Sequence, residues 1–410
     1  MGKHKRWLLL VSIFCSFSMN VSANNQPTLN IYLDADFTTM KAAAQAIELG
    51  INTALSEEGH QINGYQIKLV KKNHRGNSRR SAKHLKQYID DDNAIAVFGG
   101  LHSPPLLSNK AFINQHQILT LVPWAAAGPI TRSDDKENWI FRLSIDDSNA
   151  GKFIINQALN QGFKRPYLLL ENTGWGHANL KKMSQILQES NVKTIGVKRF
   201  NWGLNNSQAR LLLHDIVAAK PDVVVFVGNA PEGIIFAKQL AALNSGIAMR
   251  SHWGITGGDF ANKVTIKERN TIDLQFIQTK FSFISSSQTE KSRQVFNTLK
   301  QISSIRTPQD IPATTGFIHA YDLTRIFISA LKQIPLTENK ASNQRLLHQA
   351  LENLKEPVNG LIKSYDTPFS TYFVTQPNAH EALNDKDYRM GFYDNNNAVQ
   401  LMKLNNKLGN

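Results

Sequence analysis

Cysteine is nearly absent from this sequence, because Cys15 is the only one among 410 residues. The chain after Cys15 can form no disulfide and carries no thiol chemistry, so it must depend on a hydrophobic core for its stability. Long hydrophobic runs are also scarce. After the first 23 residues, no apolar stretch is long enough to cross a bilayer.

The first residues have the pattern of an export signal. A basic start at Lys3, Lys5 and Arg6 precedes an apolar core over 7–17, and small residues follow at 21–23. We therefore expect residues 1–23 to be a cleaved signal peptide and the protein to be exported in soluble form. Lipid attachment at Cys15 is disfavoured, because the large Phe14 stands where a small residue is needed.

Catalytic motifs are missing as well. The sequence contains no GxSxG, no P-loop and no pair of histidines at metal-ligand spacing with a supporting acid. Residues 133–136 match SxxK, but they lie in an acidic loop without the helix that this chemistry needs. His102 and Ser103 are neighbours in a loop, where a nucleophile and its base rarely meet. We expect neither an enzyme, such as an exported hydrolase, nor a cofactor or metal.

Acidic residues are too few to balance the basic ones, and the formal net charge is +14. Nucleic-acid binding would be one explanation, but export and the lack of any nucleic-acid module argue against it. The densest basic stretch, 68–80, is interpreted as a solvated surface, with attraction to anionic lipid as the alternative.

Short apolar strands alternate with longer helical segments from residue 29 onward, which is typical of doubly wound α/β sheets. The number of segments fits two sheets. We predict an α/β protein of two doubly wound lobes joined by a three-crossover hinge, with residues 24–142 and 279–387 in lobe 1 and 143–278 and 388–410 in lobe 2. A ligand cleft between the lobes is expected beyond the carboxyl ends of the strands. The predicted strands are 29–33, 66–70, 94–98, 118–121, 166–170, 194–197, 223–227 and 275–277, with a β-rich tail over 364–401; the predicted helices include 40–57, 80–89, 150–160, 180–189, 207–218, 232–243, 290–305 and 313–331.

The segment 94–105, AIAVFGGLHSPP, is the most informative. An uncharged run predicts a strand buried on both faces, and two glycines let the backbone turn and approach a ligand closely. Ser103 followed by Pro104 predicts an N-cap and the first helical turn, a place that favours an anion. An ordinary strand-to-helix connection explains the same pattern.

Several motifs in order resemble the periplasmic type I solute-binding proteins of the leucine/isoleucine/valine and amide group, which serve ABC transporters. The resemblance covers essentially the whole chain after residue 23. It rests on AVFGGLHS, LVPWAAAGPIT, FRLSIDDSNAG, ENTGWGHANL, VVVFVGNAPEG and HAYDLTRIFISAL.

The resemblance implies a set of ligand contacts. Ser103 would meet the carboxylate of an amino-acid ligand, Glu232 its ammonium, and Trp175 would cover it. The physical roles agree: a helix terminus for an anion, a carboxylate for a cation and an aromatic face.

The second loop departs from the family pattern, because Ala125, Ala126 and Ala127 stand where a threonine is common. One donor to a carboxylate is then missing, and His102 either replaces it or packs in its loop. The tryptophans at 124, 175, 202 and 253 each follow a predicted strand, where they either touch the ligand or seal the lobes. We name Trp124 and Ala126 as candidate contacts, and Asp259 as a further polar contact or an ordinary loop cap.

These patterns predict a periplasmic, monomeric protein that closes by a hinge over a small polar ligand, of the amino acid, amide or amine type, and presents it to an ABC permease. A ligand-sensing receptor of the same fold, signalling to a membrane histidine kinase or chemoreceptor, is the alternative. A cytoplasmic transcription factor would need an N-terminal helix-turn-helix where the signal peptide stands.

Overall fold

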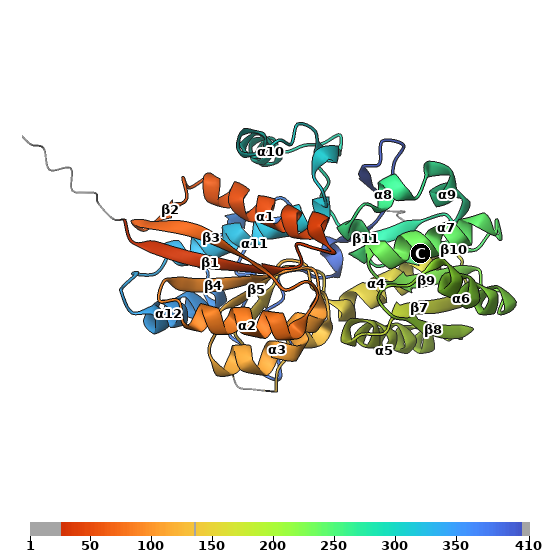
Figure 1. Ribbon diagram of the computed structural model, residues 1–410, viewed down its shortest axis with the longest axis horizontal. Helices are drawn as coiled ribbons and strands as arrows, with labels where there is room; N and C mark the ends of the chain where they lie inside the picture. The colour runs from red at the N-terminus through yellow and green to blue at the C-terminus, as the bar shows by residue number, and fades with distance from the viewer. Residues whose placement is uncertain (1–25, 135–136, 404–410) are drawn as a thin grey trace, which may run out of the picture.

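The computed structural model describes residues 26–134 and 137–403, and their strands form two main sheets (Figure 1). The signal-peptide prediction and Cys15 lie outside these residues. The first sheet defines the first lobe and has the order β2-β3-β1-β4-β5-β6. Its strands pair in parallel except for the β2–β3 hairpin. They are β1 (Thr28–Ala35), β2 (Gln61–Ile62), β3 (Tyr65–Asn73), β4 (Ala94–Gly99), β5 (Thr120–Val122) and β6 (Ile140–Arg142).

The second sheet defines the second lobe and has the order β15-β14-β11-β10-β9-β7-β8. Five strands of this sheet, from β11 to β8 in that order, pair in parallel, whereas β14 and β15 are added antiparallel at the other edge. The strands are β7 (Pro166–Glu171), β8 (Gly196–Phe200), β9 (Val223–Val227), β10 (Ala248–Ser251), β11 (Gln275–Thr279), β14 (Tyr388–Tyr393) and β15 (Val399–Leu401).

Helices cover both sheets. In the first lobe, α1 packs against α11, α2 against α3 and α12 against β4, while in the second lobe α4 packs against α5 and α6 against α7. The bounds are α1 (Lys41–Ser56), α2 (Ser78–Ile89), α3 (Ser103–Gln115), α4 (Asp147–Asn160), α5 (Gly174–Glu189), α6 (Asn206–Ala218), α7 (Ala230–Ala242), α8 (Phe260–Lys263), α9 (Ile266–Thr271), α10 (Glu290–Ile302), α11 (Thr314–Lys332) and α12 (Lys340–Glu352). Short 3₁₀ turns lie at 128–130, 253–257, 308–310 and 385–387, and a small hairpin joins β12 (Val358–Asn359) to β13 (Ser364–Tyr365).

The chain passes between the lobes three times: after β6, after β11 and before β14. The prediction of an α/β protein with two doubly wound lobes is confirmed. The central strands β4 and β9 show why, since every residue of both is buried. A parallel strand that is covered on both faces needs an uninterrupted apolar sequence, which AIAVFG and VVVFV provide. None of the helices in the described ranges is long and apolar enough to cross a membrane.

Two local predictions need correction. The N-cap of α3 is His102 rather than Ser103, and its side chain makes no capping hydrogen bond. Gly99 ends β4 and Gly100 follows it; a Cβ on Gly100 would stand 3.0 Å from Cα of Ala35, so a larger residue would be crowded there. The predicted β-rich tail is also mostly irregular, because strands in it cover only 364–365, 388–393 and 399–401.

Candidate functional site

A narrow pocket lies between the lobes, at the carboxyl ends of β4, β5, β7, β9 and β10. This is the edge at which open α/β sheets bind ligands, because the loops there are free to carry side chains. The first lobe contributes Leu101, His102, Ser103, Pro104, Trp124 and Ala126; the second contributes Glu171, Trp175, Asn229, Trp253 and Gly254.

Five residues proposed from the sequence meet in this pocket: His102, Ser103, Trp124, Ala126 and Trp175. The hydroxyl oxygen of Ser103 accepts a hydrogen bond of 3.2 Å from the backbone N–H of Ala127. Its own O–H therefore remains able to donate to a ligand acceptor. The two loops of the first lobe are joined by this bond, which fixes the wall of the pocket.

Glu232 and Asp259 lie outside the pocket lining. Glu232 is buried in the first turn of α7, where its carboxylate accepts a 2.9 Å hydrogen bond from the backbone N–H of Gly203. The side chain of Asp259 is 55% exposed and stands 4.0 Å from Lys263, at a different hollow near α8. The structure thus gives both acids contacts within the second lobe.

The acid that the pocket does contain is Glu171, the last residue of β7. Its carboxylate accepts hydrogen bonds from Thr173 Oγ1 at 2.7 Å, Trp202 Nε1 at 3.1 Å and Asn229 Nδ2 at 3.2 Å. Burial raises the pKa of Glu171 to about 7, although these hydrogen bonds oppose the rise; the negative charges of Glu232 and Asp147 add to it. A cation placed in the pocket would favour the ionised form.

Three buried tryptophans, Trp124, Trp175 and Trp253, form the apolar part of the pocket. The indole N–H of Trp175 donates a 2.9 Å hydrogen bond to Asp147, which His252 also approaches at 3.1 Å. Asp147 is fully buried, and this burial raises its pKa. The hydrogen bond from Trp175 to Asp147 therefore fixes the plane of the Trp175 ring.

Three buried polar atoms of the lining have no hydrogen-bond partner in the described part of the chain. They are Nδ1 of His102, Nε1 of Trp124 and Oδ1 of Asn229. Buried polar groups are normally paired, and an unpaired one costs about 1–3 kcal/mol. The indole N–H can only donate and the amide oxygen can only accept. The pocket therefore fits a ligand that offers both an acceptor and a donor.

Features that would hold an anion are weak here. Pro104 and Pro105 occupy the first turn of α3, so two of the backbone N–H groups that a helix terminus offers are absent. Ala126 offers no hydroxyl, and the lining contains no lysine or arginine among the residues that the structure describes. The acid and the aromatic rings dominate its chemistry.

The rim of the pocket joins the two lobes through Trp202, a loop residue of the second lobe. Its ring lies 4.9 Å from that of His102, while its N–H binds Glu171. On the other side, His102 Nε2 stands 3.3 Å from Asp36. Gly76, with φ of +69°, leaves the space for the Trp202 ring, because a Cβ there would lie 3.3 Å from it. Side chains of both lobes thus close over the pocket.

The pocket measures about 270 Å³ with the solvent at its mouth included, and between the side chains there is room for about one water molecule. Entry of a ligand therefore requires the lobes to part or the rings to move.

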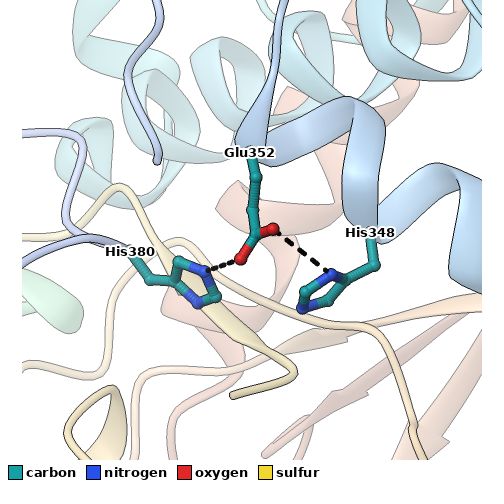
Figure 2. Close-up of side chains that lie close together, drawn as sticks. All are labelled: His348, Glu352 and His380. Carbon is teal, nitrogen blue, oxygen red and sulfur yellow. Dashed lines mark hydrogen bonds and ion pairs between the residues drawn. The ribbon is translucent and has the colours of Figure 1, made fainter. Parts of the chain in front are cut away.

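A second cluster of ionisable side chains lies in the first lobe, away from the pocket: His348, Glu352 and His380 (Figure 2). The sequence predicted no metal-ligand set. His348 and Glu352 are one turn apart on α12, but His380 reaches them from a distant loop, so sequence spacing does not reveal the group.

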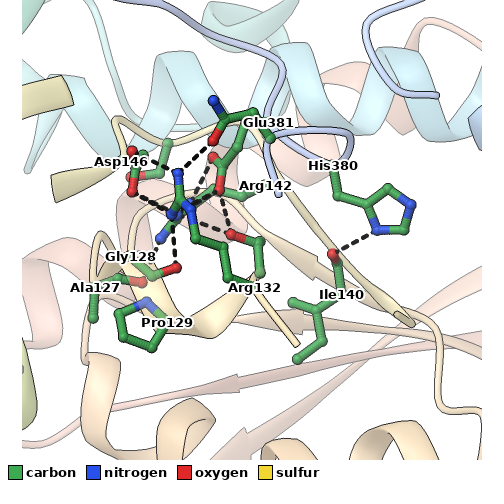
Figure 3. Close-up of polar contacts among 12 residues, drawn as sticks. Ala127, Gly128, Pro129, Arg132, Ile140, Arg142, Asp146, His380 and Glu381 are labelled. Atoms are coloured by element: carbon green, nitrogen blue, oxygen red, sulfur yellow. Dashed lines mark hydrogen bonds and ion pairs between the residues drawn. The ribbon is translucent and has the colours of Figure 1, made fainter. Parts of the chain in front are cut away.

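The first and third passages between the lobes are tied by a buried ion network (Figure 3). Arg142, at the end of β6, pairs with Glu381 at 2.5 Å and with Asp146 at 3.2 Å, and donates to the carbonyl of Ala127 at 2.8 Å. Arg132 binds Asp146 through both of its terminal nitrogens. Burial alone would raise the pKa of Asp146, but the two guanidinium groups outweigh it and lower that pKa.

Two α/β lobes, three connecting segments and a buried pocket between them define a two-lobed binding protein. A sequence model of the periplasmic binding protein family matches residues 34–387. The chain belongs to this family. As a member of a family of binding proteins, it is not an enzyme, as the sequence predicted.

Solved structures share the fold at low sequence identity. A periplasmic binding protein type 1 from Bordetella pertussis Tohama I is 14% identical, with a TM-score of 0.74 over 92% of this chain and 100% of that one. The solute-binding protein of an ABC transporter from R. palustris, in complex with benzoate, is 15% identical, with a TM-score of 0.73 over 92% and 95%.

A leucine-binding protein from Thermotoga maritima is 15% identical, with a TM-score of 0.70 over 92% of this chain and 98% of that one. No curated protein matches the sequence. One of these proteins is in complex with benzoate and another is named a leucine-binding protein, so the likeness leaves the ligand of this chain to be argued from its own pocket.

Proposed function

We propose that this protein captures a small ligand with a cationic amine group by closure of its two lobes, and presents it to an ABC permease. We infer the ligand class from the buried carboxylate of Glu171 among three tryptophans, in a lining whose described residues include no lysine or arginine. A desolvated carboxylate attracts a cation strongly, and indole faces add cation–π attraction.

The unpaired atoms of the lining refine this proposal. An ammonium group near Glu171 can also donate to Oδ1 of Asn229, while an acceptor on the ligand can meet the indole N–H of Trp124 or the hydroxyl of Ser103. Amino acids, amides and amines with a polar second end offer both kinds of group. The weak anion features favour ligands whose second end is neutral over those with a free carboxylate.

The proposed closure of the lobes rests on the fact that the pocket residues belong to both lobes. Glu171, Trp175 and Asn229 belong to the second lobe, whereas Ser103 and Trp124 belong to the first. A ligand that touches both sets stabilises the closed arrangement over an open one, by its extra contacts. The permease as partner is supported by the family and by the ABC-transporter protein among the similar structures.

A thermal-shift screen of the exported form tests this proposal. Amino acids, amides, polyamines, betaines and short carboxylates are compared, since a ligand that binds only the folded state raises Tm. We expect the largest shifts from amines and amides, and we expect them to be lost in Glu171→Gln. Glu189→Gln, on the exposed end of α5, is the matched control. A best hit without a cationic or amide group, or one that keeps its shift in Glu171→Gln, would contradict the proposal.

A further inference from the structure

We propose that His348, Glu352 and His380 form a binding site for one divalent transition-metal ion, for which Zn²⁺ is the probe. The site lies in the first lobe and is independent of the ligand pocket. Figure 2 shows the three side chains pointing toward one another, two from α12 and one from the loop that precedes β14.

The distances bring three ligand atoms around one point. Nε2 of His380 lies 3.1 Å from one oxygen of Glu352, and Nδ1 of His348 lies 3.9 Å from the other. All three ligand atoms are within 4.8 Å of one another. A tetrahedral zinc ion with bonds of about 2.0–2.1 Å holds its ligand atoms about 3.3 Å apart. His380 and Glu352 already have this spacing, and the His348 ring must move by roughly 1 Å.

The remaining nitrogen of each ring determines where the lone pairs point. Nε2 of His348 lies 3.0 Å from the carbonyl oxygen of Asn138, and Nδ1 of His380 lies 3.0 Å from that of Ile140 (Figure 3). A carbonyl only accepts, so these nitrogens carry the hydrogens. In the neutral rings, the lone pairs of His348 Nδ1 and His380 Nε2 therefore both face Glu352. Histidines that ligate metals are held in this way.

This arrangement needs a positive charge at its centre. Two lone pairs and a carboxylate repel one another unless a proton or a metal ion lies between them. In the described part of the chain, no lysine or arginine forms an ion pair with Glu352. A proton can bridge one pair of atoms, whereas a metal ion satisfies all three donors together.

Two imidazoles and a carboxylate suit Zn²⁺ and leave its fourth position to water. The rings are held by aromatic neighbours: Trp139 lies 4.4 Å from His348, and Phe141 stacks on His380 at 3.8 Å. The side chains of His348 and Glu352 are 11% and 8% exposed, so solvent reaches part of the cluster. The ion would cross-link α12 to the loop at His380 and so stabilise the fold.

Titration calorimetry on the full chain, first depleted of metal with a chelator, tests this site directly. We expect one equivalent of Zn²⁺ to bind with a Kd below about 1 μM, and Co²⁺ to give a visible absorption spectrum typical of low coordination number. A bound ion should also raise Tm, because the unfolded chain lacks the site.

Glu352→Gln is the most informative variant, because it preserves the fold contacts. With the amide oxygen in the place of Oε1, it can still accept the backbone N–H of Tyr372, which lies 3.1 Å from that oxygen, and the amide nitrogen then faces Nδ1 of His348. The variant should bind Zn²⁺ at least tenfold more weakly, as should His348→Ala. The control is His214→Asn, on the exposed surface of α6, where 85% of the side chain is accessible.

The absence of Zn²⁺ binding in the metal-depleted chain would overturn the proposal, and the cluster would then be a proton-sharing pair. Equal binding by Glu352→Gln and the natural chain would overturn it as well. Zn²⁺ titration of the natural chain still tests the proposal if His348→Ala does not fold.

Discussion

Replacing Glu171 by glutamine should remove the pH dependence of ligand binding. Burial holds the pKa of Glu171 at about 7, so roughly one tenth of the carboxyl groups are ionised at pH 6 and nine tenths at pH 8. If the cationic ligand requires the carboxylate, its affinity should rise about tenfold over this interval. The rise should level off above pH 8.

Calorimetry with the best ligand of the screen, at pH 6, 7 and 8, measures this rise. Binding below pH 7 should release about one proton, which buffers of different ionisation enthalpy detect. In Glu171→Gln the affinity should be weaker and flat with pH, whereas Glu189→Gln should follow the natural chain. A tenfold rise that persists in Glu171→Gln would refute the assignment of this pH dependence to Glu171.

The same pKa shift predicts an effect on stability without ligand. Because the pKa of Glu171 is raised from 4.5 to about 7, the folded chain binds this proton more tightly than the unfolded chain, and stability falls as pH rises through that window. Glutamine carries no charge and still fits the hydrogen bonds of Thr173 and Trp202. Glu171→Gln should therefore be more stable at pH 8, by up to about 3 kcal/mol, and nearly equal to the natural chain at pH 4.5.

Three further substitutions have defined outcomes. Trp175→Phe keeps an aromatic ring but loses the bond to Asp147, so calorimetry should show about tenfold weaker ligand binding; unchanged affinity would mean that this bond does not position the ring. Arg142→Met removes the guanidinium that pairs with the buried Glu381 and leaves Asp146 with Arg132 alone, so it should cost about 3–5 kcal/mol in urea unfolding, with a cost below 1 kcal/mol as the contrary result. Gly316→Ala would place a Cβ 2.2 Å from the Trp124 ring, so it should lose about 1–3 kcal/mol, instead of the gain usual for a helix interior, and weaken binding.

Much of the fold could be predicted because its central strands are continuous apolar segments. VVVFV at 223–227 is predicted with its exact bounds, and the helices flanking it follow from apolar spacing. The strands IFR at 140–142 and AMRS at 248–251 were missed, because they are short and contain arginine. Both arginines are buried in pairs with acids, which only the tertiary structure supplies. Helix α12 was also missed, since its sequence is largely polar.

The pocket could be predicted in part, from loops that follow strands. Ser103, Trp124 and Trp175 follow such strands and do line it, although which contacts bind a ligand stays a prediction. Glu171 had a usable signal, as the single acid at the carboxyl end of PYLLLE. No feature of the sequence indicated where the Glu232 side chain points, because its position depends on a hydrogen bond from the backbone N–H of Gly203, 29 residues away. The cluster of His348, Glu352 and His380 likewise depends on a loop without regular structure.

A crystal structure of the protein with the best amine or amide ligand of the screen tests the central claim most directly. The account predicts that the ligand lies between the lobes, with its nitrogen within hydrogen-bond distance of the Glu171 carboxylate and its body against Trp175 and Trp253. A ligand bound elsewhere, such as in the hollow at Asp259, or one whose anionic end faces Glu171, would contradict it.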